Sequence, residues 1–265
     1  MLWNSAGIPA PTRQQYFGVE SRAVRKGLER RRSVSESYEA RIREAAEQIV
    51  AREVADLRAR MDAAKGTRSG ERFRALLDGY YFDEPPAFVG ERMRPPLSSL
   101  IETIAGLAAA EVDAAASPET IRETIEAYLA RFTVKHLIRS RRQVYGMVKE
   151  HGDDFAEPLD ERLEEWEERR PGKVALEERV EAASAAAKAV WVAAGFNGLR
   201  WVLLGDSCPI CQSLRDTVIP ADQPFVGPGD EVPSHWGGEG FRPGGPVYYP
   251  PVHAGCDCSI LPTRL

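Results

Sequence analysis

The sequence lacks the segments that would place it in or across a membrane. Nowhere do eighteen apolar residues follow one another, so no membrane-spanning helix is predicted. Residues 1–9 lack the basic stretch followed by an apolar stretch that marks a secretory signal. We therefore expect a reducing compartment, where clustered cysteines bind metals more often than they form disulfides.

The chain also lacks an excess of positive charge. Lys and Arg number 35 against 40 Asp and Glu, which leaves a net charge of −5 and does not suit a protein that wraps nucleic acid over its whole surface. Solvated helix faces are the simplest interpretation of its local charge clusters, including an acidic one at residues 157–170. Contact with DNA or an acidic partner is the alternative for the basic residues, which are Arg22, Arg25, Lys26, Arg30, Arg31 and Arg32 in one cluster and Arg139, Arg141 and Arg142 in another.

Strand signals are scarce between about residue 12 and residue 200. Apolar residues recur at spacings of three and four from Tyr38 to Met61, which predicts a helix of about thirty residues. Ser33 and Glu36 have the spacing of a capping box at its start, and residues 66–70 are expected to end it. A helix of this length needs partners against which to pack.

Further breaks are predicted at prolines and glycines. The five prolines and glycines of residues 85–96 indicate irregular structure over 80–96. Ser117 followed by Pro118 predicts a helix start, and Pro171-Gly172 predicts another break before a helix that reaches Ala194. The predicted fold is mainly α: an elongated helical body over residues 1–198, which could divide near 80–96, and a small irregular and β module over 199–265 held together by zinc.

Cysteine is absent from the first 207 residues, and all four cysteines lie in the last fifth of the chain. A Cys-x-x-Cys turn directs two sulfurs at one point, which is half of a tetrahedral zinc site. Only four ligands close such a site, so we expect Cys208, Cys211 and His253 plus one of Cys256 and Cys258. Because four protein ligands leave no open position, structural zinc is the expected cofactor.

The segment between these two ligand groups is poor in apolar residues. Residues 220–251 include eight prolines and seven glycines, a composition that cannot form a packed core by itself. A metal ion bound at both ends would order the segment. We therefore expect Cys208→Ser or Cys211→Ser to release zinc and disorder residues 205–262 while the helical body stays folded.

The sequence lacks the additional residues that a catalytic role of these cysteines and histidines would require. A nucleobase deaminase needs His-x-Glu upstream of its cysteines, whereas His136 and His151 are followed by Leu-Ile and Gly-Asp. A redox Cys-x-x-Cys belongs in a βαβ pattern, which is missing, and no third group is evident to orient a Cys–His nucleophile pair. His235 is interpreted as a loop-packing residue. No catalytic residue is predicted.

The C-terminal part resembles the Mu-type phage head morphogenesis family, also called minor head or minor capsid proteins. The resemblance is carried by Trp201–Leu204, Asp206, Cys208-Pro-Ile-Cys211-Gln-Ser-Leu214 and Pro250-Pro-Val-His253-Ala-Gly-Cys256-Asp-Cys258, and it covers about residues 120–262. Two departures are Asp257, where the family usually has Arg, and Arg215-Asp216, where a turn glycine is common. Aspartate tolerates that backbone at some cost.

The resemblance implies a non-enzymatic component of the virion, assembled in the host cytoplasm and associated with the portal vertex. Its implied roles are head morphogenesis, capsid assembly, and DNA packaging or ejection, with portal, major capsid or scaffold proteins as partners. The basic clusters would then face DNA or acidic partner surfaces. Two alternatives stay open from the residues themselves: a toxin-like, metal-dependent hydrolase or nuclease, and a zinc-containing nucleic-acid-binding adaptor.

Overall fold

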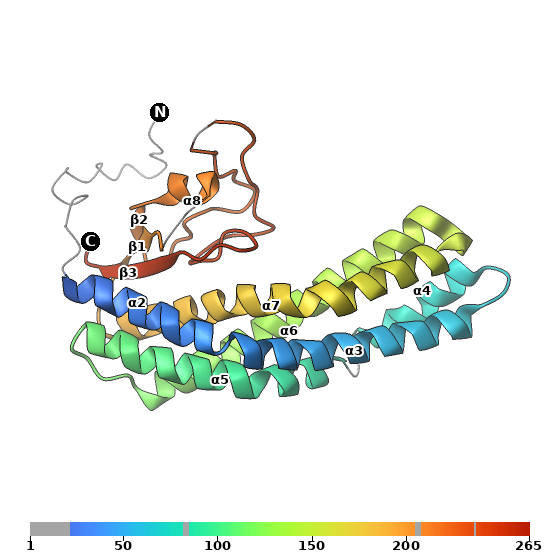
Figure 1. Cartoon of the computed structure of the whole chain (residues 1–265), viewed down its shortest axis with the longest axis horizontal. Helices are drawn as coiled ribbons and strands as arrows, with labels where there is room; N and C mark the ends of the chain where they lie inside the picture. Colours follow the sequence, from blue (N-terminus) through green and yellow to red (C-terminus); the bar gives the residue numbers. More distant parts are fainter. Residues whose placement is uncertain (1–21, 82–84, 205–207, 236) are drawn as a thin grey trace.

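A computed structural model describes residues 22–81, 85–204, 208–235 and 237–265, and within them the chain is mainly helical with a small sheet near its C-terminus (Figure 1). This confirms the predicted mainly α fold with a C-terminal strand region. No helix in these ranges is long and apolar enough to cross a membrane. The helices of the body are α2 (Arg22–Ser37), α3 (Glu39–Ala64), α4 (Ser69–Tyr80), α5 (Pro85–Glu111), α6 (Pro118–His151) and α7 (Ala156–Ala193), with a short 3-10 turn, η1 (Gly152–Asp154), between the last two.

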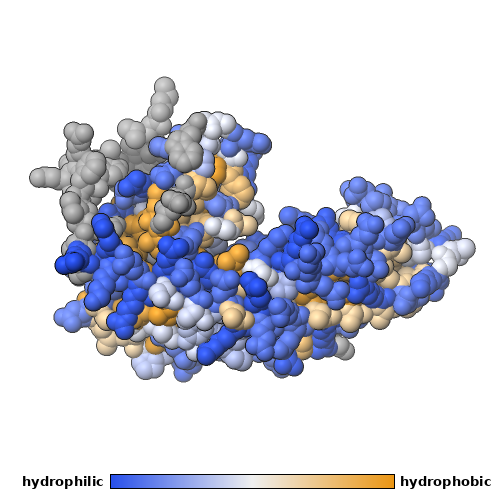
Figure 2. Space-filling view, in the orientation of Figure 1, coloured by the Kyte–Doolittle hydropathy of each residue, from blue (hydrophilic) through white to orange (hydrophobic). Residues whose placement is uncertain are grey.

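The long helices α3, α5, α6 and α7 lie side by side along the longest dimension of the molecule (Figure 1). Helix α4 lies at one end of this bundle, and the C-terminal module lies over α2 and α7 at the other. One continuous core runs through the bundle, from Leu77 and Phe155 to Trp191. On the face seen in Figure 2, hydrophilic side chains cover most of the helical body, as amphipathic helices around one core require.

The break predicted over residues 80–96 is wrong for residues 85–96, because α5 begins at Pro85 and continues through Pro95 and Pro96. Residues 82–84 lie outside the described ranges. A proline at a helix start loses no intrahelical hydrogen bond, so Pro85 fits the first turn. Pro96 is buried, and the helix that contains it supplies Leu97, Leu100 and other fully buried side chains to the core.

The break predicted at Pro171-Gly172 is also wrong, because α7 runs without interruption from Ala156 to Ala193. An interior proline costs a helix about 3 kcal/mol, whereas one fully buried large apolar side chain contributes about 1.5–3 kcal/mol. Helix α7 buries Trp166 and Trp191 among many others, and it packs on both α3 and α5. Tertiary packing therefore outweighs the local preference at Pro171.

The helix start predicted at Ser33 is wrong, since this residue lies inside α2, which ends at Ser37. The serines instead mark the end of α2: Ser35 Oγ donates to the carbonyl of Arg32 at 2.8 Å, and Ser37 Oγ donates to that of Val34 at 2.7 Å. Such bonds compete with helix continuation. The long helix expected after this point is confirmed as α3, of 26 residues.

The helix start predicted at Ser117 is confirmed, with the Thr120 N–H donating to Ser117 Oγ and Pro118 in the first turn. Helix α6 continues for 34 residues to Gly152, where a positive φ ends it. Long helices separated by short connections therefore form the body, as the alternation of helices and breaks predicted.

The C-terminal module is built on an antiparallel sheet in the order β2-β1-β3, with β1 at Gly198–Val202, β2 at Val218–Pro220 and β3 at Ser259–Thr263. Leu199 and Ile260 belong to the core of the helical body. Contrary to the expectation of a coreless loop, Val226, Val232 and Val247 form a second core with Trp201 and buried cysteines. The division of the chain at residue 198 stays a prediction.

Candidate metal centre

Cys208 and Cys211 lie at the start of the short helix α8 (Pro209–Leu214). Cys208 is the residue before the helix, and its Sγ accepts a hydrogen bond from the Cys211 N–H at 3.5 Å. Pro209 occupies the first helical position, where its fixed φ suits the turn. Local structure therefore directs both sulfurs to the same side.

The second ligand group comes from the segment that leads into β3. A turn with Gly255 at φ 77° and a hydrogen bond from the Cys256 N–H to the His253 carbonyl brings His253 close to Cys256. His253 Nδ1 lies 2.8 Å from the carbonyl oxygen of Ala254, so it carries the proton and donates. In the neutral imidazole, Nε2 is then the unprotonated nitrogen, which is the form that binds a metal.

All five predicted ligands lie in one cluster. His253 Nε2 lies 2.9 Å from Cys208 Sγ and 3.1 Å from Cys211 Sγ, and Cys211 Sγ lies 3.6 Å from Cys256 Sγ. Cys211, Cys256 and Cys258 form a second group whose sulfurs all lie within 4.8 Å of one another. Two thiolates on one tetrahedral zinc ion would lie about 3.8 Å apart, so this cluster could hold a metal ion.

The electrostatics of the cluster suit a cation. Hydrogen bonds from the thiols of Cys211 and Cys258 lower the pKa of Cys256 to about 3, because they stabilise its thiolate. The same contacts raise the pKa of Cys211, which acts as a donor to Cys256. Protein alone thus stabilises one buried thiolate here, and a second would need a positive charge beside it. A divalent ion would supply that charge.

Trp201 supports the same interpretation from beneath the cluster. Its indole Nε1–H is buried and makes no hydrogen bond with the described residues. It faces Cys258. The hydrogen bond with Cys211 acts to lower the pKa of Cys258, but its contact with Cys256 and its burial outweigh this and raise that pKa, and the Trp201 contact is a smaller effect in favour of the thiolate. A buried N–H beside a sulfur is a suitable partner for a metal-bound or metal-adjacent thiolate. His235 is exposed and lies outside both ligand groups.

Asp257, between the two last cysteines, joins the cluster to the helical body. Its carboxylate lies 2.7 Å from Arg32 Nη2 on α2 and 3.3 Å from Arg179 Nη1 on α7. Arg179 is nearly buried and also pairs with Glu39. The sequence showed Asp257 only as a departure from a family pattern, because its partners lie far away in the chain.

Arg31 cannot act as the surface DNA contact expected of it. Only 4% of its side chain is exposed, and its guanidinium donates to Glu111, to Ser259 Oγ and to the carbonyl of Ile260. It therefore fixes α2 against α5 and β3. Of the other residues in that basic cluster, Arg22, Arg25, Lys26 and Arg30 are exposed.

The second basic cluster lies on α6. Arg139 is half exposed and pairs with Glu177 of α7 at 3.1 Å, Arg141 lies over the ring of Tyr145, and Arg142 is exposed. Binding of DNA by either cluster stays a prediction.

Two further expectations concern the residues around the cysteines. Asp216 has a φ of 58°, so it occupies the left-handed turn position at which the family often has glycine, as the sequence indicated. Asp206 lies outside the described residues.

A group of carboxylates that the sequence did not single out lies on α7. Glu177, Glu178 and Glu181 come within ligand distance of one another, but Lys135 of α6 lies between them, with its Nζ 2.8, 3.4 and 2.6 Å from their oxygens. The lysine already supplies the cation that such a group needs. This group is a structural ion-pair network between α6 and α7.

Comparison with known proteins gives no relative: no family model, no curated protein and no solved structure matches the chain. Its likeness to the minor head family rests on the sequence motifs from Trp201 to Cys258 alone, and membership of that family is a proposal.

Proposed function

We propose that this chain is a structural minor head protein of a bacteriophage whose C-terminal module is held together by a zinc ion. The observation that carries the zinc site is that two distant segments, 208–211 and 253–258, bring five soft ligands into two groups of three that share Cys211. The observation that carries the family is the motif in which those ligands stand.

The number of ligands favours a structural role over a catalytic one. A catalytic zinc ion keeps one position for water or substrate, whereas a structural ion has four protein ligands. Here Cys208, Cys211 and His253 form one ligand group, and Cys256, in contact with Cys211, would be the fourth ligand. Cys211 and Cys256 are buried. A further cysteine, Cys258, lies within reach.

We propose Cys256 as the fourth ligand and Cys258 as its neighbour. Cys256 Sγ lies 3.6 Å from Cys211 Sγ, close to the edge length of a zinc tetrahedron, whereas Cys258 is in contact with Trp201. Metal content of purified Cys256→Ser and Cys258→Ser proteins distinguishes them. The first is expected to lose zinc and the second to keep it, and the reverse result would exchange the two assignments.

The module with its ion would hold β1, β3 and α2 in one arrangement that docks on portal, capsid or scaffold subunits. Co-expression with the portal and major capsid proteins, followed by co-purification and metal analysis on the same sample, tests this. Wild type is expected to co-purify with about one zinc ion per chain. Cys211→Ser, which removes the sulfur common to both ligand groups, is expected to lose both the metal and the partner.

A nuclease or hydrolase would behave differently. If the wild-type protein cleaved DNA or RNA in a metal-dependent manner and Cys211→Ser abolished cleavage, the structural proposal would be wrong. Tight DNA binding that the Cys211→Ser change abolishes would instead favour the adaptor.

A further inference from the structure

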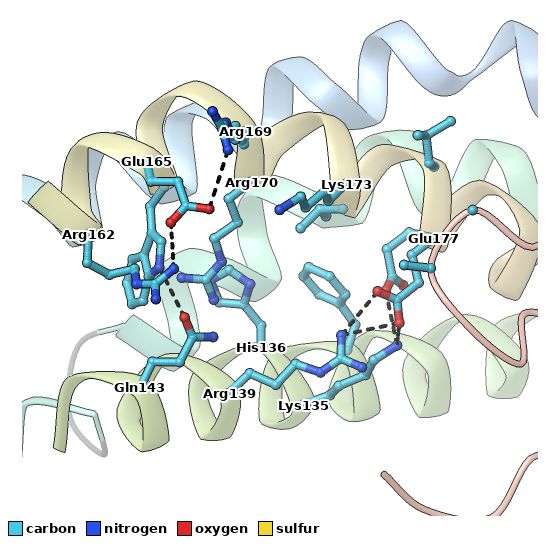
Figure 3. Close-up of a pocket in the computed structure, with 17 residues that line it drawn as sticks. Lys135, His136, Arg139, Gln143, Arg162, Glu165, Arg169, Arg170, Lys173 and Glu177 are labelled. Atoms are coloured by element: carbon cyan, nitrogen blue, oxygen red, sulfur yellow. Dashed lines mark hydrogen bonds and ion pairs between the residues drawn. The ribbon is translucent and has the colours of Figure 1, made fainter. Parts of the chain in front are cut away.

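A groove lies between α6 and α7, and Ala254 and Gly255, from the turn between His253 and Cys256, line it as well (Figure 3). Its volume is about 270 Å³. Six lysine and arginine side chains line it against three glutamates, so its lining carries an excess of positive charge on a chain whose net charge is −5.

The glutamates are gathered at the two ends of this groove (Figure 3). At one end, Glu165 pairs with Arg162 and lies 3.9 Å from Arg169. At the other, Glu177 pairs with Arg139 and Lys135. Each of these end cations thus has a carboxylate partner, whereas Lys173, between the two ends, has no such partner among the described residues.

Two cations of α7 occupy that middle. Lys173 is exposed and, within the described ranges, forms no ion pair or hydrogen bond; Figure 3 shows it between the two ends. Arg170 lies deeper, with 13% of its side chain exposed and its Nη1 3.4 Å from Glu53. Its Nη2 donates to Ser140 Oγ.

A buried histidine nitrogen at the floor of the groove lacks a hydrogen bond. His136 is buried, and its Nε2 lies 3.3 Å from the same Glu53 oxygen without a hydrogen bond to any described residue. One carboxylate thus faces both a guanidinium and an imidazole. Glu53 already balances the charge of Arg170, and burial lowers the pKa of His136 and keeps its imidazole neutral, so an anion in the groove would balance Lys173.

The size and lining of the groove favour a compact oxyanion. Phosphate oxygens accept from the planar guanidinium fork and from the lysine ammonium at the same time. Trp166 and Phe132 line the groove, but both are 4% exposed, and Arg170 already covers the Trp166 ring at 4.2 Å. Neither ring is available for base stacking, so recognition would stop at the phosphate.

We infer that the middle of the α6–α7 groove binds a phosphate group through Lys173 and Arg170, with Arg139 at its edge. The source is a free or small-molecule phosphate or the backbone of a nucleic acid strand, since both present the same oxygens. This site is independent of the zinc ion and of the role in the virion, because its cations all come from the two helices.

Calorimetric titration of the full-length protein with inorganic phosphate, at low and at physiological salt, tests the site. Lys173→Gln and Arg139→Gln keep the polar side chains without the charge and leave the Arg170–Glu53 pair intact. Lys149→Gln is the matched control, because Lys149 is also an exposed lysine, on α6 but outside the groove. Thermal melts verify that each variant is folded.

We expect Lys173→Gln to weaken phosphate binding about tenfold, Arg139→Gln to weaken it less, and Lys149→Gln to leave it unchanged. Binding should weaken as salt rises. A single-stranded oligonucleotide that competes for the site with higher affinity than phosphate identifies the backbone as the source, and weaker competition identifies a small ligand. No phosphate binding, or an equal loss in Lys149→Gln, would overturn the inference.

Discussion

Asp257 shows how a single side chain can connect a candidate metal-binding cluster to the helices beside it. It lies between two candidate ligands, and its carboxylate reaches Arg32 on α2 and Arg179 on α7. Because Arg179 is nearly buried, its charge depends on Asp257 and Glu39 for compensation. The ion pairs therefore stabilise the position of the module on the body.

We expect Asp257→Asn to lower the free energy of unfolding by about 1–3 kcal/mol, because hydrogen bonds between charged groups are lost while side-chain shape is kept. Urea denaturation measures this. Zinc content should not change, since Asp257 is not a ligand. Glu231→Gln is the control: its partner Arg242 is exposed, so the change should stay within about 0.5 kcal/mol. Equal effects of the two substitutions would contradict the proposed connection.

Glu178 is a buried carboxyl whose protonation depends on folding. Burial, followed by the neighbouring Glu181 carboxylate, raises the pKa of Glu178 to about 7, against the opposing effect of Lys135. Tyr128 donates a hydrogen bond to it. A raised pKa in the folded state means that the protonated form is favoured by folding. The resulting stability is complete below the ordinary pKa of 4.5 and is lost as the pH rises toward 7.

Glu178→Gln should therefore remove a fall in the free energy of unfolding, on the order of 2–3 kcal/mol, that wild type shows between about pH 4.5 and 7. The matched variant Glu177→Gln should act in the opposite sense. Burial opposes ionisation of Glu177, but Lys135 and Arg139 outweigh it and lower its pKa, so its contribution is present at neutral pH and lost on acidification. Denaturation curves at several pH values measure both. Parallel profiles for wild type and Glu178→Gln would disprove the assignment.

Among the secondary structure elements, the prolines inside α5 and α7 show that tertiary packing can override a local helix-breaking preference. Pro171 lies in α7 and Pro95 in α5, yet both helices continue, because their neighbours bury more apolar surface than one missing hydrogen bond costs. The free-energy cost of an interior proline can be read from the sequence directly. The apolar contacts that offset this cost become known only when the fold is known. Ser117, whose signal concerns a helix terminus, was predictable because capping is a local interaction.

Replacing a glycine with alanine should change the stability of the protein in opposite directions at Gly70, at a helix end, and at Gly146, inside a helix. A Cβ on Gly70, in the first turn of α4, would lie 2.5 Å from the carbonyl oxygen of Gly152, so α4 and η1 would have to separate. We expect Gly70→Ala to destabilise the protein by about 1–3 kcal/mol. In contrast, a Cβ on Gly146 in α6 meets nothing within 4 Å, and Gly146→Ala should stabilise by up to about 1 kcal/mol. Thermal denaturation of both variants measures the difference, and a stabilised Gly70→Ala protein would contradict the packing described.

For the whole molecule, the sequence predicted the types of secondary structure and the candidate ligands better than the long-range contacts between them. The helical body, the strand region and the five candidate ligands followed from spacing and residue type, which act locally. The burial of Arg31, the ion pairs of Asp257 and the contacts of Leu199 and Ile260 with the helical core did not. Each of these joins residues that are far apart in the chain, so no local pattern contains it.

These connections predict that loss of the metal affects one end of the molecule only. Arg31 donates to Ser259 and Ile260, and Leu28 packs with Val202 and Leu261, so α2 is held by the strands that the cluster orders. Removal of zinc with a chelator should lower the hydrogen-exchange protection of α2 together with that of residues 208–262.

Helix α4 provides the internal control for this experiment, since it lies at the opposite end of the bundle (Figure 1) and packs on α3, α6 and η1. Its amide protection should not change, because within the described residues α4 packs mainly on α3, α6 and η1. Hydrogen exchange followed by mass spectrometry, with and without chelator, resolves the two regions. If α2 kept its protection while the module lost it, α2 would be held by α5 and α7 alone, and the strands would have no part in its docking.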